Sequence, residues 1–428
     1  MDISALLGLI LYQMAILLVS PLFWLVVVII GWQIRRTAKM KSDFFHVPRE
    51  KIMRKTVFNV LLGLGGGFIG SVLLVLLGVS VEEIGIEYLW IVAIVLIMLR
   101  QRFMCFAYAG GLIALSKYLF GWPAVNIPQL MGLVAVLHLV EALLIYAGGA
   151  SKAMPVYIMG REQRLVGGFV MQSFWPLPLV ALSAALTPIG LAGAGDMLAM
   201  PGWWPLLPME YIGSRMIPHM TLVYSMLPVL AALGYSDLAL TSTTRQKAHW
   251  SARQLMFYSA GLLVLAILAA KVPVLAILPA LYAPLGHELL IKIGQKQENK
   301  GEYLYTEPSQ GVMILDVLEG FAAEQAGLKT GDILLELNEQ PLEKTADLYT
   351  IESQLTGQVT VTYKREDQRL QAILAKGTAS SLGIITVPEA RGLRYLDFNG
   401  GDGLALALLR RVKRWLHKHR HTVSAPKS

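Results

Sequence analysis

Charged residues and cysteine are both scarce in this chain. Charged residues make up 15% of the 428 positions and apolar residues 55%, whereas a typical soluble domain carries about 25% charged residues. Cys105 is the single cysteine, which excludes an internal disulfide and any zinc site built from several cysteines. No cleavable export signal is expected, because the first apolar run follows Asp2 rather than a basic stretch. The composition indicates a membrane protein.

Long apolar runs are abundant. A helix that crosses a hydrocarbon core of about 30 Å needs roughly 20 apolar residues. Nine windows meet or approach this length and predict an α-helical polytopic bundle of about eight or nine transmembrane helices within residues 1–291. The windows are 5–32, 57–79, 84–99, 103–120, 129–148, 165–190, 217–235, 254–270 and 272–291.

Basic residues are distributed unevenly between the predicted loops. Eight lie between the first two windows: Arg35, Arg36, Lys39, Lys41, Arg49, Lys51, Arg54 and Lys55. Loops on the opposite side hold only Lys117, Arg215 and Lys271. Because basic loops stay in the cytoplasm during insertion, we expect the N-terminus outside the cell and everything after residue 291 inside.

The remaining residues predict a small α+β domain at 292–390 and a tail at 391–428. Alternating apolar residues predict short strands near 312–318, 333–337 and 359–363, with helices near 321–326 and 346–355. The segment GVMILDVLEGFAAEQAGLKTGDILLELNEQPL, residues 311–342, resembles the central signature of bacterial PDZ domains. Gly327 suits the left-handed end of a helix, and Gly331 with Asp332 suits the tight turn before the next strand.

This resemblance implies a peptide-binding groove. PDZ domains add a partner peptide as an extra strand, and a glycine-containing loop captures its terminal carboxylate. Residues Leu382, Gly383 and Ile384 match that loop, and the facing helix would present Leu348, Ile351 and Leu355. Helical spacing alone does not separate groove residues from core residues. A bulky residue in place of Gly383 is expected to block the peptide and leave the fold intact.

A polytopic region followed by a cytoplasmic PDZ domain resembles the MinJ family of division-site membrane proteins of Gram-positive rods. That resemblance implies a membrane-anchored adaptor or scaffold without catalysis, metal or cofactor. Its partners would be a DivIVA-like polar scaffold and a MinD-like division inhibitor. It would reside in the bacterial cell membrane and be enriched at septa and poles. The oligomeric state stays open.

An intramembrane metalloprotease of the site-2 type is the alternative. Such enzymes combine PDZ domains with a membrane-embedded H-E-x-x-H motif, in which two histidines hold zinc and the glutamate activates water. His287 and Glu288 begin such a motif, but Ile291 occupies the position of the second histidine. His138 and Glu141 are the candidates to complete the site. Alternatively, His287 and Glu288 have a structural role and cap the end of a helix at the membrane interface.

Two further segments have a distinctive composition. Residues 64–70, LGGGFIG, lack the lysine of a phosphate loop and predict a close-packing helix face. The tail at 401–421 predicts a basic amphipathic helix that binds anionic lipids, with nucleic acid and a protein partner as weaker alternatives. Its membrane-surface residues are Arg410, Arg411, Lys413, Arg414, Trp415 and Lys418.

Overall fold

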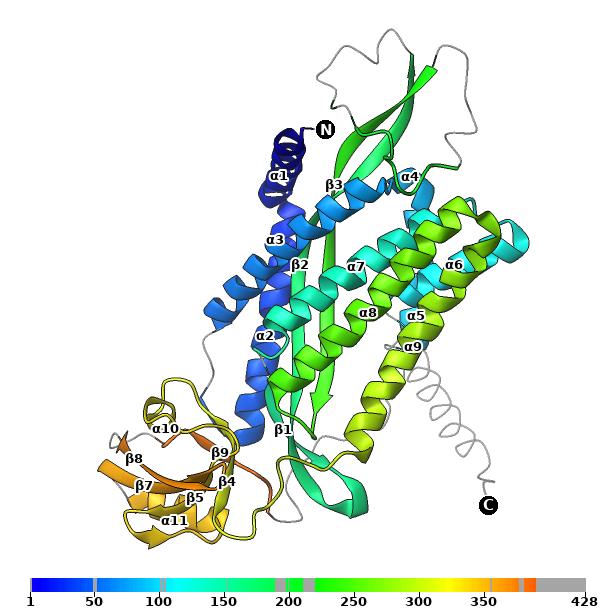
Figure 1. Ribbon diagram of the computed structural model, residues 1–428. Coiled ribbons are helices and arrows are strands. Elements are labelled where there is room, and N and C mark those ends of the chain that lie inside the picture. The colour runs from blue at the N-terminus through cyan, green and yellow to red at the C-terminus, as the bar shows by residue number, and fades with distance from the viewer. Residues whose placement is uncertain are drawn as a thin grey trace, which may run out of the picture.

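The computed structural model has an elongated helical body with a small domain at one end (Figure 1). It describes residues 2–48, 52–100, 103, 105–151, 153–188, 198, 200–210, 220–354, 356–376 and 381–389. The helices of the body are α1 (Ile3–Val19), α2 (Pro21–Phe45), α3 (Ile52–Leu77), α4 (Val81–Ile84), α5 (Ile86–Leu99), α6 (Phe106–Phe120), α7 (Ile127–Gly148), α8 (Thr244–Lys271) and α9 (Ile277–Lys300). Its strands are β1 (Met154–Met159), β2 (Leu165–Pro188) and β3 (Met220–Ala239).

Several of these helices are long and apolar enough to cross a membrane. Four described helices qualify alone, namely α3, α7, α8 and the segment Pro273–Lys300 that contains α9. The pair α1 and α2, bent by 69°, could make a fifth, and α5 and α6 are shorter apolar helices. The predicted number of eight or nine helical spans is therefore not confirmed.

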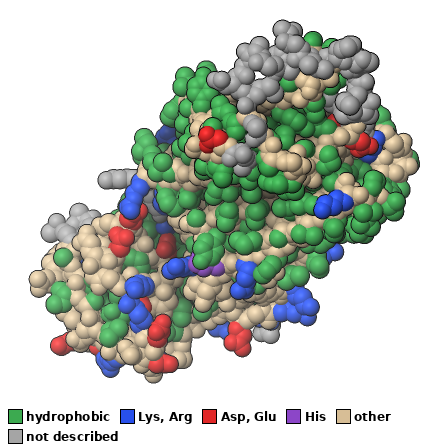
Figure 2. Space-filling view, turned by 45° about the horizontal axis from the view of Figure 1, so that its top comes forward, with side chains coloured by type: hydrophobic (Ala, Val, Ile, Leu, Met, Phe, Trp, Pro, Cys, Tyr) green, Lys and Arg blue, Asp and Glu red, His purple; other side chains and the backbone are tan. Residues whose placement is uncertain are grey.

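The outer surface of the body is apolar. Large side chains such as Trp24, Val28, Ile91, Phe257 and Leu285 are more than half exposed. Figure 2 shows hydrophobic side chains over most of the body, whereas charged side chains gather on the small domain and around its junction with the body. An apolar surface of this extent is expected to contact lipid.

Two of the predicted helices are strands instead. The windows 165–190 and 217–235 fall on β2 and β3, which form a long antiparallel pair from Phe169↔Ala239 to Pro188↔Met220. Prolines explain the error. A helix over residues 165–190 would contain Pro176 and Pro178, and one over residues 217–235 would contain Pro228. Each proline inside a helix costs about 3 kcal/mol of stability. A strand accepts proline at an edge that makes no ladder bond.

Helix α3 covers this edge of β2. Asn59 Nδ2 donates to the Phe174 carbonyl at 2.9 Å, and Ser71 Oγ accepts from Val180 N at 2.8 Å. Between them, Gly63 and Gly67 approach the carbonyl oxygens of Pro176 and Pro178 so closely that a Cβ would lie 2.1 and 2.4 Å away.

The helix and the strand stay in close contact over several residues because the spacing of every fourth helix residue nearly equals that of every second strand residue. Every fourth residue of a helix advances about 6.0 Å, and every second residue of a strand advances about 6.7 Å. The stripe 59, 63, 67 and 71 can therefore follow the strand edge 174, 176, 178 and 180. The glycine-rich segment is a close-packing face, as predicted, and it covers a sheet edge that hydrocarbon would leave unpaired.

The small domain has a six-stranded sheet with the order β8-β7-β5-β4-β9, and β6 pairs with β5. Its elements are β4 (Val312–Val317), α10 (Ala322–Gln325), β5 (Ile333–Leu337), β6 (Gln340–Pro341), α11 (Thr345–Gln354), β7 (Gly357–Arg365), β8 (Gln368–Lys376) and β9 (Ile384–Thr386). Its core includes Val312, Ile314, Leu334 and Val361. Within this sheet β9 is the last strand, so one of its edges has no strand partner.

Candidate functional site

Helix α11 lies along strand β9. At one end, Thr345 Oγ1 is 3.3 Å from Thr386 Oγ1, and at the other Glu352 contacts Leu382. The Tyr349 hydroxyl, from the middle of α11, lies against Thr386. The helix and the strand edge thus form the two walls of the groove that the sequence predicts.

The predicted groove side chains belong mainly to the core of the small domain. Leu382 and Leu348 are 0% and 1% exposed, Ile384 is 8% exposed, and Ile351 packs against the same core. Leu355 lies outside the described residues. All three residues of β9 are buried, so what the groove presents at its surface is the exposed residues of α11, chiefly Tyr349.

An internal carboxylate occupies the predicted carboxylate loop. Glu352 Oε1 accepts from Leu382 N at 2.5 Å and from Ser381 Oγ at 2.9 Å. Ser381 Oγ in turn accepts from Gly383 N at 3.2 Å. Two N–H groups of this loop are thus already satisfied within the chain.

Gly383 is required by the fold itself. Its φ is +81°, a left-handed conformation that side chains disfavour, and a Cβ there would lie 2.2 Å from Phe321 Cβ. The expectation that a bulky residue at this position leaves the fold intact is therefore wrong. The sequence suggested that Gly383 allows a ligand to come close to the backbone. The group that lies close to Gly383 is instead Phe321 of the same domain.

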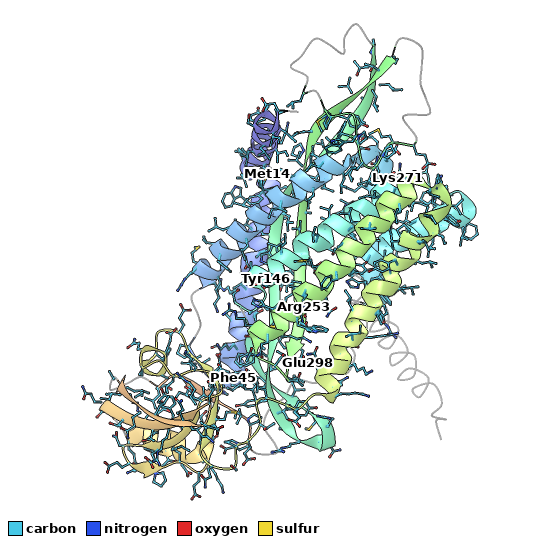
Figure 3. The ribbon with its side chains drawn as sticks, in the orientation of Figure 1. Met14, Phe45, Tyr146, Arg253, Lys271 and Glu298 are labelled. Atoms are coloured by element: carbon cyan, nitrogen blue, oxygen red, sulfur yellow. The ribbon has the colours of Figure 1, made fainter. Side chains whose placement is uncertain are left out.

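The small domain docks on one end of the helical body. Lys41 Nζ of α2 is 2.8 Å from Asp316 Oδ2 of β4, and the Tyr157 hydroxyl of β1 donates to the Thr386 carbonyl at 2.8 Å. Burial raises the pKa of the Tyr157 hydroxyl further above its ordinary value, which keeps this group a hydrogen-bond donor. Figure 3 shows Phe45 at this end of α2, where its ring packs on that of Tyr157 with centroids 5.2 Å apart.

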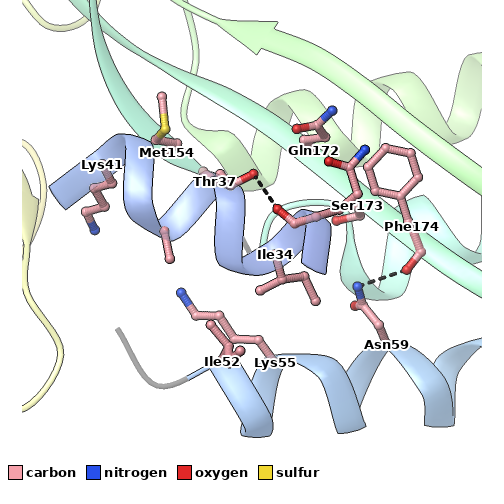
Figure 4. Close-up of a pocket in the computed structure, with 13 residues that line it drawn as sticks. Ile34, Thr37, Lys41, Ile52, Lys55, Asn59, Met154, Gln172, Ser173 and Phe174 are labelled. Atoms are coloured by element: carbon pink, nitrogen blue, oxygen red, sulfur yellow. Dashed lines mark hydrogen bonds between the residues drawn. The ribbon is translucent and has the colours of Figure 1, made fainter. Parts of the chain in front are cut away.

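A partly open cavity of about 40 Å³ lies behind this contact, between α2, α3 and the strands (Figure 4). Lys41, Lys55, Asn59 and Ser173 are among its lining residues. Asn59 Oδ1 and Ser173 Oγ are buried and have no hydrogen-bond partner in the described part of the chain. A polar cavity of this size can hold water, which would satisfy these two atoms.

The structure brings together two of the four residues considered for a metalloprotease. The rings of His138 in α7 and His287 in α9 are 5.4 Å apart, and Cys105 joins them. Glu141 and Glu288 are outside this group of potential ligands. Glu288 accepts from the Tyr108 hydroxyl at 2.8 Å and lies 4.0 Å from Lys292.

His287 and Glu288 do not cap a helix end, because α9 continues to Lys300. Cys105 was overlooked as a ligand. The only signal for it in the sequence was a lone cysteine at the predicted start of an apolar helix.

The predicted basic tail, including all six of its membrane-surface residues, lies outside the described residues. Its lipid binding therefore stays a prediction.

Two comparisons with known proteins match this chain, one over the PDZ region and one over most of its length. Residues 285–362 match the PDZ domain family. Over 350 residues, the chain is 23% identical to the cell division topological determinant MinJ of Bacillus subtilis (strain 168), which covers 77% of this chain and 82% of the relative. These findings identify a MinJ-like protein with a PDZ domain.

Solved PDZ domains align with about a fifth of the chain. The PDZ domain of an SdrC-like protein from Listeria monocytogenes is 18% identical and covers 19% of this chain and 92% of its own, with a TM-score of 0.17. The corresponding domain from Listeria innocua is 26% identical and covers 18% and 93%, with a TM-score of 0.16.

Proposed function

We propose that this protein is a membrane-anchored PDZ adaptor that helps to place the cell-division site. In this role it links a DivIVA-like polar scaffold to a MinD-like division inhibitor, with the PDZ domain and the C-terminus in the cytoplasm. The observation that carries the proposal is the similarity to MinJ, which covers 77% of this chain and therefore extends into the helical body.

Recognition would use the edge of β9 that has no strand partner. Gly383 O and Val387 N bond to Leu318 N and Met313 O, so the backbone groups of the intervening alternate residues, Ile384 and Thr386, point to the other edge. The Thr386 carbonyl there accepts from the Tyr157 hydroxyl of the body, so strand addition requires the small domain to release this contact. A partner segment could add there as a further strand. Since Glu352 already fills part of the carboxylate loop, the proposed ligand is an internal extended segment rather than a free C-terminus.

Site-specific photocrosslinking tests this mode of binding. A photoreactive phenylalanine derivative replaces Tyr349, which is 53% exposed at the groove, or Ile373, which is 64% exposed on the opposite edge strand β8. Full-length protein in nanodiscs is then irradiated with purified DivIVA or MinD. We expect a crosslink from position 349 and none from 373. Equal crosslinking from both positions, or none from either, would contradict recognition at β9.

Septum placement tests the cellular role. The chain is expressed in Bacillus subtilis that lacks its own MinJ, and misplaced septa are counted. The adaptor proposal expects restored placement, and it expects Glu288→Gln to behave as the unchanged chain, because no general base is needed. An intramembrane protease would instead lose turnover without this carboxylate. Loss of placement with Glu288→Gln at normal protein level would favour the protease.

A further inference from the structure

Three potential metal ligands meet inside the helical body. Cys105 caps the N-terminus of α6, His138 lies in the middle of α7, and His287 lies in the middle of α9. One ligand atom from each residue lies within 4.8 Å of the other two. Within the described residues, this is the only group of three such side chains.

Hydrogen bonding orients His138 as a ligand. Its Nδ1 is 2.7 Å from the Val134 carbonyl, which can only accept, so Nδ1 carries the proton. In the neutral ring Nε2 then has a free lone pair, and it faces Cys105 Sγ at 2.8 Å. A ring nitrogen that donates to a backbone carbonyl while the other faces the metal is the usual arrangement of metal-bound histidine.

The distance between Cys105 and His138 suits zinc after a small adjustment, and the ligand atom of His287, within 4.8 Å of both, has to move inward by up to about 1.5 Å. With Zn–S of about 2.3 Å and Zn–N of about 2.0–2.1 Å, tetrahedral ligand atoms lie roughly 3.3–3.6 Å apart. The separation of Cys105 Sγ and His138 Nε2 therefore has to open by less than about 1 Å. Cys105 lies at the helix cap, in extended backbone just before α6, where a shift of this size does not disturb a helix.

Aromatic side chains surround the two histidines. Tyr258 packs against His138 and His287 with ring centroids 5.5 and 6.0 Å apart. The Tyr108 hydroxyl lies 3.5 Å from His287 Nδ1 and donates to Glu288, which places a carboxyl group next to the cluster. This second layer would restrict water and hold the ligands in place.

We infer that Cys105, His138 and His287 bind one zinc ion, with a fourth position left for water or a small ligand. The thiol loses its proton on binding, and the ion ties the start of α6 to α7 and α9. This ligand set differs from an H-E-x-x-H pair, since no two of its residues are one helical turn apart. The inference does not depend on the adaptor function, and either can fail alone.

Labelling of Cys105 tests the site without changing the protein. Because this cysteine is unique in the chain, a thiol-reactive maleimide reports only on it. In untagged full-length protein in nanodiscs, we expect Zn²⁺ to slow labelling at least tenfold and a chelator to restore it. Labelling that Zn²⁺ does not slow would overturn the site.

Metal content and cobalt spectroscopy identify the ligands. We expect about one zinc per chain, and a thiolate-to-cobalt charge-transfer band when Co²⁺ replaces zinc. Cys105→Ala should abolish the band, and His287→Gln should weaken binding at least tenfold. His249→Gln is the matched control, because His249 stacks on Tyr146 away from the cluster and should retain full binding. Metal retained by Cys105→Ala, or lost equally in the His249 control, would refute the assignment.

Discussion

Glu352 Oε1 accepts a 2.5 Å hydrogen bond from the Leu382 backbone N–H, so a side chain of the PDZ helix fills the loop that would capture a partner's carboxylate. Removing this acceptor leaves a buried N–H unpaired, which costs about 1–3 kcal/mol. We expect Glu352→Ala to lower the stability of the PDZ domain by this amount, and Glu352→Gln to lower it less, because its amide oxygen can still accept.

Hydrogen exchange of the full-length protein would measure this loss at the PDZ amides. Glu343→Ala is the control, since Glu343 is exposed on the same domain. Unchanged exchange in Glu352→Ala would show that the contact contributes nothing.

Docking of the PDZ domain should depend on Lys41 and Asp316. The Lys41 side chain is 9% exposed, and its ammonium is 2.8 Å from the carboxylate. Reversing one charge leaves two like charges at a nearly buried contact, so we expect Lys41→Asp to release the domain and the double reversal with Asp316→Lys to restore it. Protease cleavage within residues 301–311, which connect α9 to β4, reports release.

The Arg54–Glu319 pair provides a matched control for docking. It bridges the same two parts at 2.9 Å, but its side chains are 85% and 58% exposed. Exposed pairs contribute about 0–1 kcal/mol, so Arg54→Glu should hardly change cleavage. Equal release by both reversals would mean that long-range charge, rather than the buried contact, holds the domain.

The close approach of α3 to β2 predicts different effects for neighbouring glycines. A Cβ at Gly67 would lie 2.4 Å from the Pro178 carbonyl oxygen, whereas a Cβ at Gly65 meets nothing within 4 Å. We expect Gly67→Ala to destabilise the body by about 1–3 kcal/mol, and Gly65→Ala to be neutral or slightly stabilising. Thermal unfolding in detergent distinguishes them, and equal melting temperatures would contradict the packing.

The orientation of the protein can be tested by cysteine labelling in intact cells. In a Cys105→Ser background, single cysteines replace Lys39, Thr360 or Glu87, all of which are exposed. We expect a membrane-impermeant reagent to label position 87 from outside, and positions 39 and 360 only after the cells are opened. Labelling of position 360 in intact cells would reverse the topology and remove the cytoplasmic adaptor role.

Local patterns in the sequence were sufficient for the PDZ domain. Gly327 and Gly331 both have positive φ, as their turns require, and the alternation around Leu335 follows a real strand. The same patterns failed for β2 and β3, because hydropathy counts apolar residues without regard to their period. Pro176, Pro178 and Pro228 were the available warning against helices there.

The sequence by itself determined a strongly apolar chain with a PDZ domain, because composition and turn chemistry act over a few residues. Only the tertiary structure decided which distant groups meet. Cys105 and His138 are 33 residues apart and His287 is farther still, and Glu352 reaches Leu382 across 30 residues. Such pairings depend on how helices and strands pack, which is set by the fit of whole surfaces, as where Gly63 admits the Pro176 carbonyl, and not by local periodicity.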